Sequence, residues 1–191
     1  SLDIPRGGRC LIQSENEAAI LALLRVTAGI EVAGAGRLVR PGARNLRLLP
    51  ERPYLPPGTL RDALVAADID HVVSDRRVIE ALGQWGLDGI LARTSGLHTE
   101  QDWESLLSLG EQQLLACLHV ILAAPGFVVL DRPSTALGIE RTRDVLNRFA
   151  EASIGYVKLG HAKGQDDLYD AIVDVRADGS WSVAGRPLPH A

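Results

Sequence analysis

The residues from Asp102 to Gln113 read DWESLLSLGEQQ and place a hydroxyl, a glycine and an acid at the start of an apolar helical run. Ser108 followed three positions later by Glu111 is the pattern of a helix N-cap. The backbone N–H groups at such a helix start, together with the helix dipole, favour a phosphate group. The run therefore predicts either a phosphate-binding helix start around Ser108 and Gly110 or a cap that only begins the helix.

An acid and a histidine each follow a short apolar run. Asp131 comes directly after Phe127 to Leu130, and His161 follows Ile154 to Leu159 across Gly160. A continuous apolar run such as Phe127 to Leu130 is typical of a strand that is buried on both faces of a parallel sheet, and Ile154 to Leu159 predicts a second strand. An acid at such a strand end can hold Mg²⁺ through water, but both residues also suit an ordinary polar strand end.

Strands and helices alternate around these residues. Arg9 to Gln13 predicts a strand, and a helix follows with Ile20, Leu23 and Leu24 on one face and Gly29 at its end. Further predicted strands are Arg37 to Val39, Leu46 to Leu49 and Ile154 to Leu159, with a closing hairpin of Ala171 to Val175 and Trp181 to Val183. Further predicted helices are Leu60 to about Leu91, Glu111 to Ala123 and Glu140 to Ala150. This order predicts an α/β fold with a mostly parallel sheet core and a helical insertion.

The composition is that of one ordinary globular domain. The 191 residues are 46% apolar and 23% charged with a net charge of −4, so no overall basic field draws the chain to nucleic acid. Cys10 and Cys117 lie in apolar runs, which predicts two buried thiols in a reducing, cytoplasmic compartment. No apolar run approaches the roughly 20 residues that span a bilayer. Because the sequence contains no Met, we expect a segment of a longer protein.

Four ordered segments resemble the nucleotide-binding domain of ABC transporters. LSLGEQQ, at residues 107–113, resembles the signature motif of the peroxisomal-type and bacterial peptide or cobalamin-type half-transporters. FVVLD, at residues 127–131, is similar to a Walker B strand, and LGH, at residues 159–161, to the switch-histidine motif. LPERPYLPPGTLRDAL, at residues 49–64, is similar to the Q-loop segment. The resemblance runs from about residue 7 to residue 183.

The resemblance implies a P-loop NTPase-like ABC ATPase fold that fills residues 1–191 as a single domain, with a helical subdomain at about 60–124. The N-terminal strand and the transmembrane region of the family would lie outside the chain. ATP and Mg²⁺ are the implied cofactors, with Asp131 and Glu51 near the metal and His161 and Glu51 at the catalytic positions. Two such domains meet head to tail in the family, so the signature residues would touch ATP held by the partner. These residues are Ser108, Leu109, Gly110, Glu111 and Gln112.

The segment aligned with the Walker A loop departs from the family pattern. A working loop reads GxxxxGK followed by Ser or Thr, with glycines that wrap the phosphates, a lysine that meets their charge and a hydroxyl for Mg²⁺. The aligned residues read SENEAAIL, with Ser14 and Ala19 at the glycines, Ile20 at the lysine and Leu21 at the hydroxyl. Glu15 and Glu17 add negative charge where a triphosphate would lie. We therefore predict no tight ATP binding at this site.

The departures continue downstream of the Walker A segment. Arg132 stands at the catalytic glutamate, and an arginine cannot accept a proton at neutral pH. Gly138 replaces the D-loop aspartate, Glu51 replaces the Q-loop glutamine, and Leu114 replaces the arginine after the signature. We therefore predict no ATP hydrolysis at this site.

Three functions remain open at this point. The first is a degenerate partner that lends its signature residues in trans to ATP held by a competent second domain. The second is a nucleotide-independent structural or dimerisation module of a membrane protein, because a fold can outlive its chemistry. The third is a slow ATPase that uses Lys158 or Arg25 as substitutes and energises transport. In each case the resemblance implies a transmembrane domain and a second nucleotide-binding domain as partners, at the cytoplasmic face of a membrane.

Overall fold

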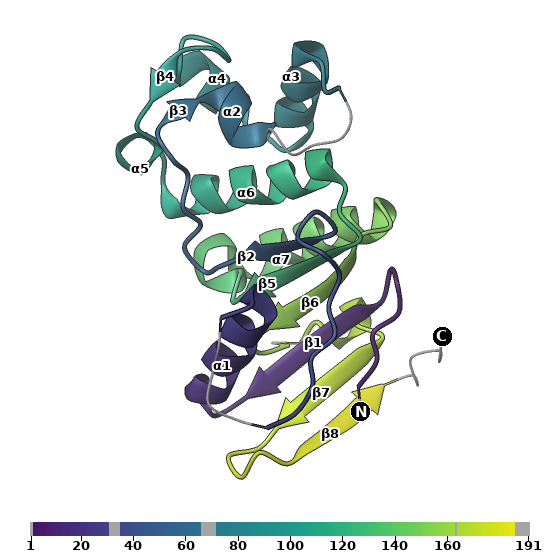
Figure 1. Ribbon diagram of the computed structural model, residues 1–191. Coiled ribbons are helices and arrows are strands. Elements are labelled where there is room, and N and C mark those ends of the chain that lie inside the picture. Colours follow the sequence, from purple (N-terminus) through teal and green to yellow (C-terminus); the bar gives the residue numbers. More distant parts are fainter. Residues whose placement is uncertain (1, 31–34, 66–71, 163, 186–191) are drawn as a thin grey trace. The chain divides into compact units, whose positions relative to one another are not determined.

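A computed structural model describes residues 2–30, 35–65, 72–162 and 164–185 of the chain. The chain divides into two compact units, which are Ser1–Pro50 with Pro125–Ala191, named here the sheet unit, and Glu51–Ala124, named here the helical unit. Figure 1 shows the elements of both units along the chain.

In the described part of the sheet unit, six strands form one sheet in the order β2-β5-β6-β1-β7-β8. The first five run parallel to their neighbours, and β8 is antiparallel to β7. The α/β class with a mostly parallel sheet is therefore confirmed. The strands are β1 (Arg9–Ser14), β2 (Leu46–Leu49), β5 (Phe127–Asp131), β6 (Gly155–Leu159), β7 (Ala171–Val175) and β8 (Trp181–Gly185).

The described residues of the sheet unit also form the helices α1 (Glu17–Ala28) and α7 (Ser134–Glu151) and the short 3-10 helix η1 (Asp166–Leu168). The predicted end of α1 is confirmed, because Gly29 takes a left-handed conformation with φ +84° and only glycine does so without steric cost. Helix α7 begins six residues before the predicted Glu140. Gly138 interrupts it with φ 76° and ψ 176°, so its first turn is set apart from the rest.

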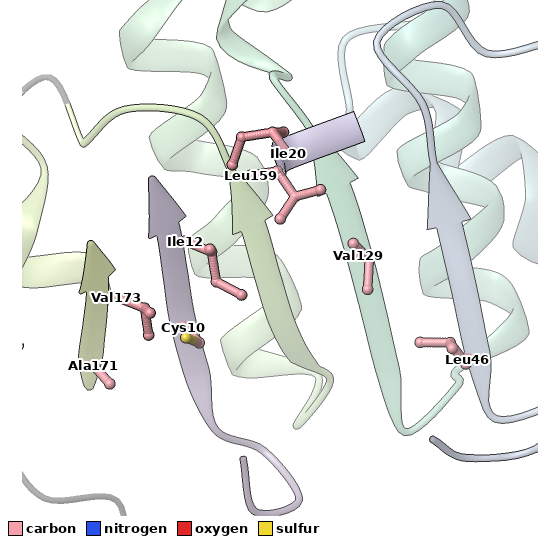
Figure 2. Close-up of a cluster of buried hydrophobic side chains, with 8 residues drawn as sticks. All are labelled: Cys10, Ile12, Ile20, Leu46, Val129, Leu159, Ala171 and Val173. Atoms are coloured by element: carbon pink, nitrogen blue, oxygen red, sulfur yellow. The ribbon is translucent and has the colours of Figure 1, made fainter. Parts of the chain in front are cut away.

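The core of the sheet unit explains the apolar runs in its sequence. On one face of the sheet, Cys10 and Ile12 of β1, Val129 of β5 and Leu159 of β6 pack with Ile20 of α1 (Figure 2). Successive strand residues point to opposite faces, and the alternate positions are buried as well: Leu11, Val128 and Leu130 are fully buried. Because both faces are covered, these strands are apolar at nearly every position.

The helical unit contains five helices and a two-stranded antiparallel ladder among its described residues. A capping box between Thr59 and Asp62 starts α2, and Ser74 caps α3. Nδ1 of His119, on α6, lies 3.1 Å from the Leu64 carbonyl oxygen at the end of α2. The elements are β3 (Gly58–Thr59), α2 (Leu60–Leu64), α3 (Asp75–Gln84), α4 (Asp88–Arg93), β4 (Glu100–Gln101), α5 (Trp103–Leu106) and α6 (Leu109–Ala123).

Two local predictions were wrong. The predicted strand at Arg37–Val39 is irregular and exposed, because it joins no ladder and Pro41 follows closely. The β3–β4 ladder was missed because each strand has only two residues, too few to show a period. Within the described ranges, the helices are all too short or too polar to cross a bilayer.

Candidate nucleotide site

The predicted Walker residues of the sheet unit gather at the edge where β1, β5 and β6 end. Ligands of parallel α/β sheets bind outside these carboxyl ends. Ser14 ends β1, Asp131 ends β5, and His161 follows β6 by two residues. A cavity of about 70 Å³ lies at this edge, and its lining includes Ser14, Glu17, Ile20, Arg132 and His161. The structure therefore brings together the sheet-unit residues that the sequence singled out.

The junction between β1 and α1 is too short to wrap a phosphate. Only Glu15 and Asn16 separate the strand from the helix. The Asn16 N–H donates to the Ser14 hydroxyl at 3.0 Å, and the Asn16 side chain accepts from the Ala18 N–H at 3.0 Å. The chain therefore caps this helix start with its own side chains, at the place where a P-loop would offer N–H groups to phosphate.

The residues aligned with the end of the Walker A motif lie inside α1. Ile20, at the lysine position, is 4% exposed and belongs to the apolar cluster of Figure 2. Leu21, at the hydroxyl position, is 53% exposed. Ala19 is half-buried in the first turn of the same helix. The lysine position is thus part of the hydrophobic core, and none of these three side chains can ligate Mg²⁺ or neutralise phosphate.

Arg132 joins the two acids at this edge. Its Nη1 lies 2.7 Å from Oε2 of Glu17, and its Nε lies 3.1 Å from Oδ1 of Asp131. The Asp131 side chain is only 9% exposed, whereas that of Glu17 is 68% exposed. The guanidinium therefore links the end of β5 to the start of α1. The sequence shows that Arg132 cannot act as a base but does not reveal this pairing, although the acids Glu15 and Glu17 indicate a need for a cation.

Lys158 and His161 do not replace the missing lysine. The buried Lys158 ammonium donates to the His161 carbonyl oxygen at 2.6 Å and lies 5.8 Å from the centre of the Tyr169 ring. Lys158 lines the cavity at this edge, but it pairs in register with Leu130 and not with Asp131, and its ammonium is already bound to a backbone carbonyl. The His161 side chain is exposed at the edge.

The signature residues of the helical unit form the predicted helix start. Ser108 is the N-cap of α6, and its hydroxyl accepts from the Glu111 N–H at 3.3 Å. Oε2 of Glu111 in turn accepts from the Ser108 N–H and hydroxyl, each at 2.9 Å. Burial raises the pKa of Glu111, but the bonds from Ser108 and an ion pair with Arg93 outweigh it, so this pKa lies below the ordinary glutamate value. The predicted N-cap is therefore confirmed.

The remaining predicted residues also belong to the helical unit. Leu109 and Gly110 are half-buried in the first turn of α6, and the Gln112 side chain donates to the Leu107 carbonyl oxygen at 3.0 Å. Glu51 is half-buried at the start of the unit. The predicted pairing of Glu51 with Asp131 as metal ligands therefore stays a prediction.

The Walker side chains at the sheet edge do not fit the implied cofactors, although there is room for a ligand beside them. Ligand pockets for small molecules enclose about 300–1,000 Å³. The cavity at Arg132 encloses about 70 Å³, and a more open hollow of about 490 Å³, lined in part by Ser14, Glu15 and His161, lies at the same edge. The described residues contain no group of three or more His, Cys, Asp or Glu side chains placed to hold a metal ion. In the family pattern the acid at the end of β5 would lie near Mg²⁺. Here that acid, Asp131, already contacts the Arg132 guanidinium.

Known proteins match the chain along almost its whole length, although no family model matches it. An uncharacterized ABC transporter ATP-binding protein of Synechocystis sp. is 29% identical over 184 residues, which cover 96% of this chain and 28% of that protein. An uncharacterized ABC transporter ATP-binding protein of Haemophilus influenzae is 31% identical over 185 residues, which cover 96% of this chain and 31% of that protein. The lysosomal cobalamin transporter ABCD4 of Homo sapiens is 26% identical over 193 residues, covering 96% and 32%.

The chain is an ABC nucleotide-binding domain. The resemblance to the branch with peroxisomal-type and cobalamin-type members is confirmed by these relatives and by an ABC transporter D family member of Arabidopsis thaliana. This ABC domain spans about a third of the length of most of the relatives it matches.

Proposed function

We propose that this ABC domain serves a membrane transporter without binding or hydrolysing ATP at its own sheet edge. It lends Ser108, Leu109, Gly110, Glu111 and Gln112 in trans to ATP held by a competent second nucleotide-binding domain. Its other partner is a transmembrane domain, and the ABC domain itself lies at the cytoplasmic face of the membrane. One contrast carries the proposal: the signature helix start is complete, whereas the lysine position of the Walker A segment is buried in the core.

Three features of the sheet edge support an inert site. Ile20 contributes no charge and packs into the apolar cluster. Arg132 cannot act as the general base that activates water, and its guanidinium already contacts Asp131 and Glu17. The helix start at Asn16 is capped by the chain itself. ATP binding would have to displace these interactions, and no lysine would be present to contact the phosphates.

The start of α6 supports a phosphate role in trans. The first intrahelical bond of α6 runs from the Gln112 N–H to the Ser108 carbonyl oxygen at 3.0 Å. The N–H groups of Leu109 and Gly110 therefore precede the hydrogen-bonded ladder and point out of the helix start. An α-helix of 15 residues adds its dipole at the same end.

The test is ATP-driven association with a competent ABC domain whose catalytic glutamate is changed to glutamine to trap the complex. Sedimentation velocity with Mg-ATP should show a heterodimer that disappears without nucleotide. Ser108→Arg should abolish it, whereas Ser105→Arg, a matched change of an exposed serine on α5, should not. Ser108→Asp opposes a phosphate and keeps a helix-capping residue, but its carboxylate would also face that of Glu111. Its urea midpoint is therefore measured beside its association, and the Glu111→Gln background removes this repulsion. Association that ignores nucleotide, or that survives both Ser108 variants, would contradict the proposal.

A nucleotide-independent dimerisation module is the second candidate. It is favoured by the capping box, because the Ser108 hydroxyl and the Glu111 carboxylate already satisfy each other. It predicts an equally strong heterodimer with and without ATP. The slow ATPase gains no support: the Lys158 ammonium donates to the His161 carbonyl oxygen, and Arg25 lies about 12 Å along the axis of α1 from its start.

A further inference from the structure

The acids at the sheet edge need a positive charge that the family site would take from Mg²⁺ and lysine. Asp131 is 6% exposed at the end of β5, and a buried carboxylate without a counter-charge is costly. Glu17 adds a second carboxylate at the start of α1. Ile20 stands at the lysine position and supplies no charge. The edge therefore carries acids whose usual cations are missing.

Arg132 is held so that its guanidinium meets this need. Its backbone takes φ +42°, a left-handed conformation that is rare outside glycine and persists only where the surrounding structure holds it. The Arg132 N–H donates to the Leu159 carbonyl oxygen at 3.1 Å, which ties the turn to β6. An added Cβ at Gly160 would lie 3.1 Å from Cγ of Arg132, so the absence of a side chain at Gly160 leaves room for the arginine stem.

We infer that Arg132 is a built-in replacement for the divalent cation of the family site. The guanidinium contacts both the Asp131 and the Glu17 carboxylates and offsets one of their two negative charges from inside the chain. The position therefore stays occupied at every metal and nucleotide concentration. This inference deepens the proposal of an inert sheet edge and is independent of the trans role of the signature residues.

Removal of Arg132 should therefore create a metal site. Mg²⁺ and Mn²⁺ prefer oxygen ligands, and Mg²⁺ is held by one or two carboxylates while it keeps several of its waters. Asp131 and Glu17 would provide such carboxylates once the guanidinium is gone. Ser14, Ser134 and Thr135 line the cavity beside Glu17 and Arg132.

The experiment is a titration of the ABC domain with Mn²⁺ alone, in which electron paramagnetic resonance measures the free ion. Wild type should leave millimolar Mn²⁺ free. Arg132→Gln, which keeps most of the stem that packs on Gly160, should bind one ion per chain on the order of tenfold or more tightly than wild type. Asp131→Asn in the same background should abolish this gain. Arg141→Gln, a matched change of an exposed arginine on α7, should behave as wild type.

A second measurement keeps the inference testable if Arg132→Gln is unstable. Mg²⁺ should raise the urea midpoint of that variant, but not of wild type, above the midpoint in KCl of equal ionic strength. The inference is overturned if wild type binds Mn²⁺ through Asp131, or if folded Arg132→Gln gains no metal affinity. Neither assay contains nucleotide or a partner domain, so a failure of the trans proposal leaves these outcomes unchanged.

Discussion

Neighbouring residues of α1 give the most direct test of the claim that the Walker A lysine position has become core. Ile20 is 4% exposed and packs with strand residues of the sheet, whereas Leu21 is 53% exposed. Full burial of an isoleucine side chain contributes about 1.5–3 kcal/mol, and the cavity left by truncation adds to the loss. Ile20→Ala should therefore lower the free energy of unfolding by about 2–4 kcal/mol. Leu21→Ala should change it by less than about 0.5 kcal/mol.

The assay is urea unfolding followed by far-UV circular dichroism, which reports the helices and strands of the whole chain. Ile20→Lys, which restores the residue of a working Walker A motif, should be as costly as Ile20→Ala, because an ammonium would enter an apolar cluster. It should also fail to create ATP binding, since the β1–α1 junction still lacks a wrapping loop. Equal costs for Ile20→Ala and Leu21→Ala, or a stable Ile20→Lys variant that binds ATP, would refute the reasoning.

Four further outcomes are expected. Calorimetric titration of wild type with Mg-ATP should show no saturable heat at millimolar nucleotide, and micromolar binding would contradict the inert sheet edge. Glu111→Ala should cost about 1 kcal/mol at neutral pH. Because the pKa of Glu111 in the folded chain is lowered from 4.5, the difference in unfolding free energy between wild type and Glu111→Ala should vanish as the pH falls through that pKa. Urea unfolding measured at a series of pH values from acid to neutral tests this. Burial raises the pKa of the Cys10 and Cys117 thiols to about 12, so a thiol reagent at pH 8 should label neither until urea unfolds the chain. Gly160→Ala should cost about 1–2 kcal/mol in urea unfolding, since its φ is +116° and its Cβ would crowd Arg132.

Much of the sheet unit could be predicted from the sequence, because its strands are buried on both faces. Apolar runs such as Phe127–Leu130 and Ile154–Leu159 need no partner to be recognised, and Gly29 marks the end of α1 by its backbone freedom alone. The segment at Arg37–Val39 has strand-forming residues, but pairing depends on a neighbour that sequence does not reveal. The β3–β4 ladder was missed because each of its strands has only two residues.

The candidate site was predictable only where one residue type decides the chemistry. The loss of lysine at Ile20 and of a base at Arg132 can be read from residue types, and so can the capping box of Ser108 and Glu111. The contact between Arg132 and Glu17 joins residues 115 positions apart. Such a contact follows from the register of parallel strands and a left-handed turn, neither of which leaves a local signal.

The replacements at the sheet edge form one consistent set. Once Ile20 enters the core, the edge loses its lysine, and Glu17 adds a further negative charge to the uncompensated Asp131. A neutral residue at position 132 would leave that buried carboxylate without a partner, whereas an arginine in a left-handed turn reaches both acids. The signature helix differs, because Ser108 and Glu111 would be retained for capping alone. The complete capping box therefore fits both candidate functions, which the ATP dependence of association and the Ser108 variants separate.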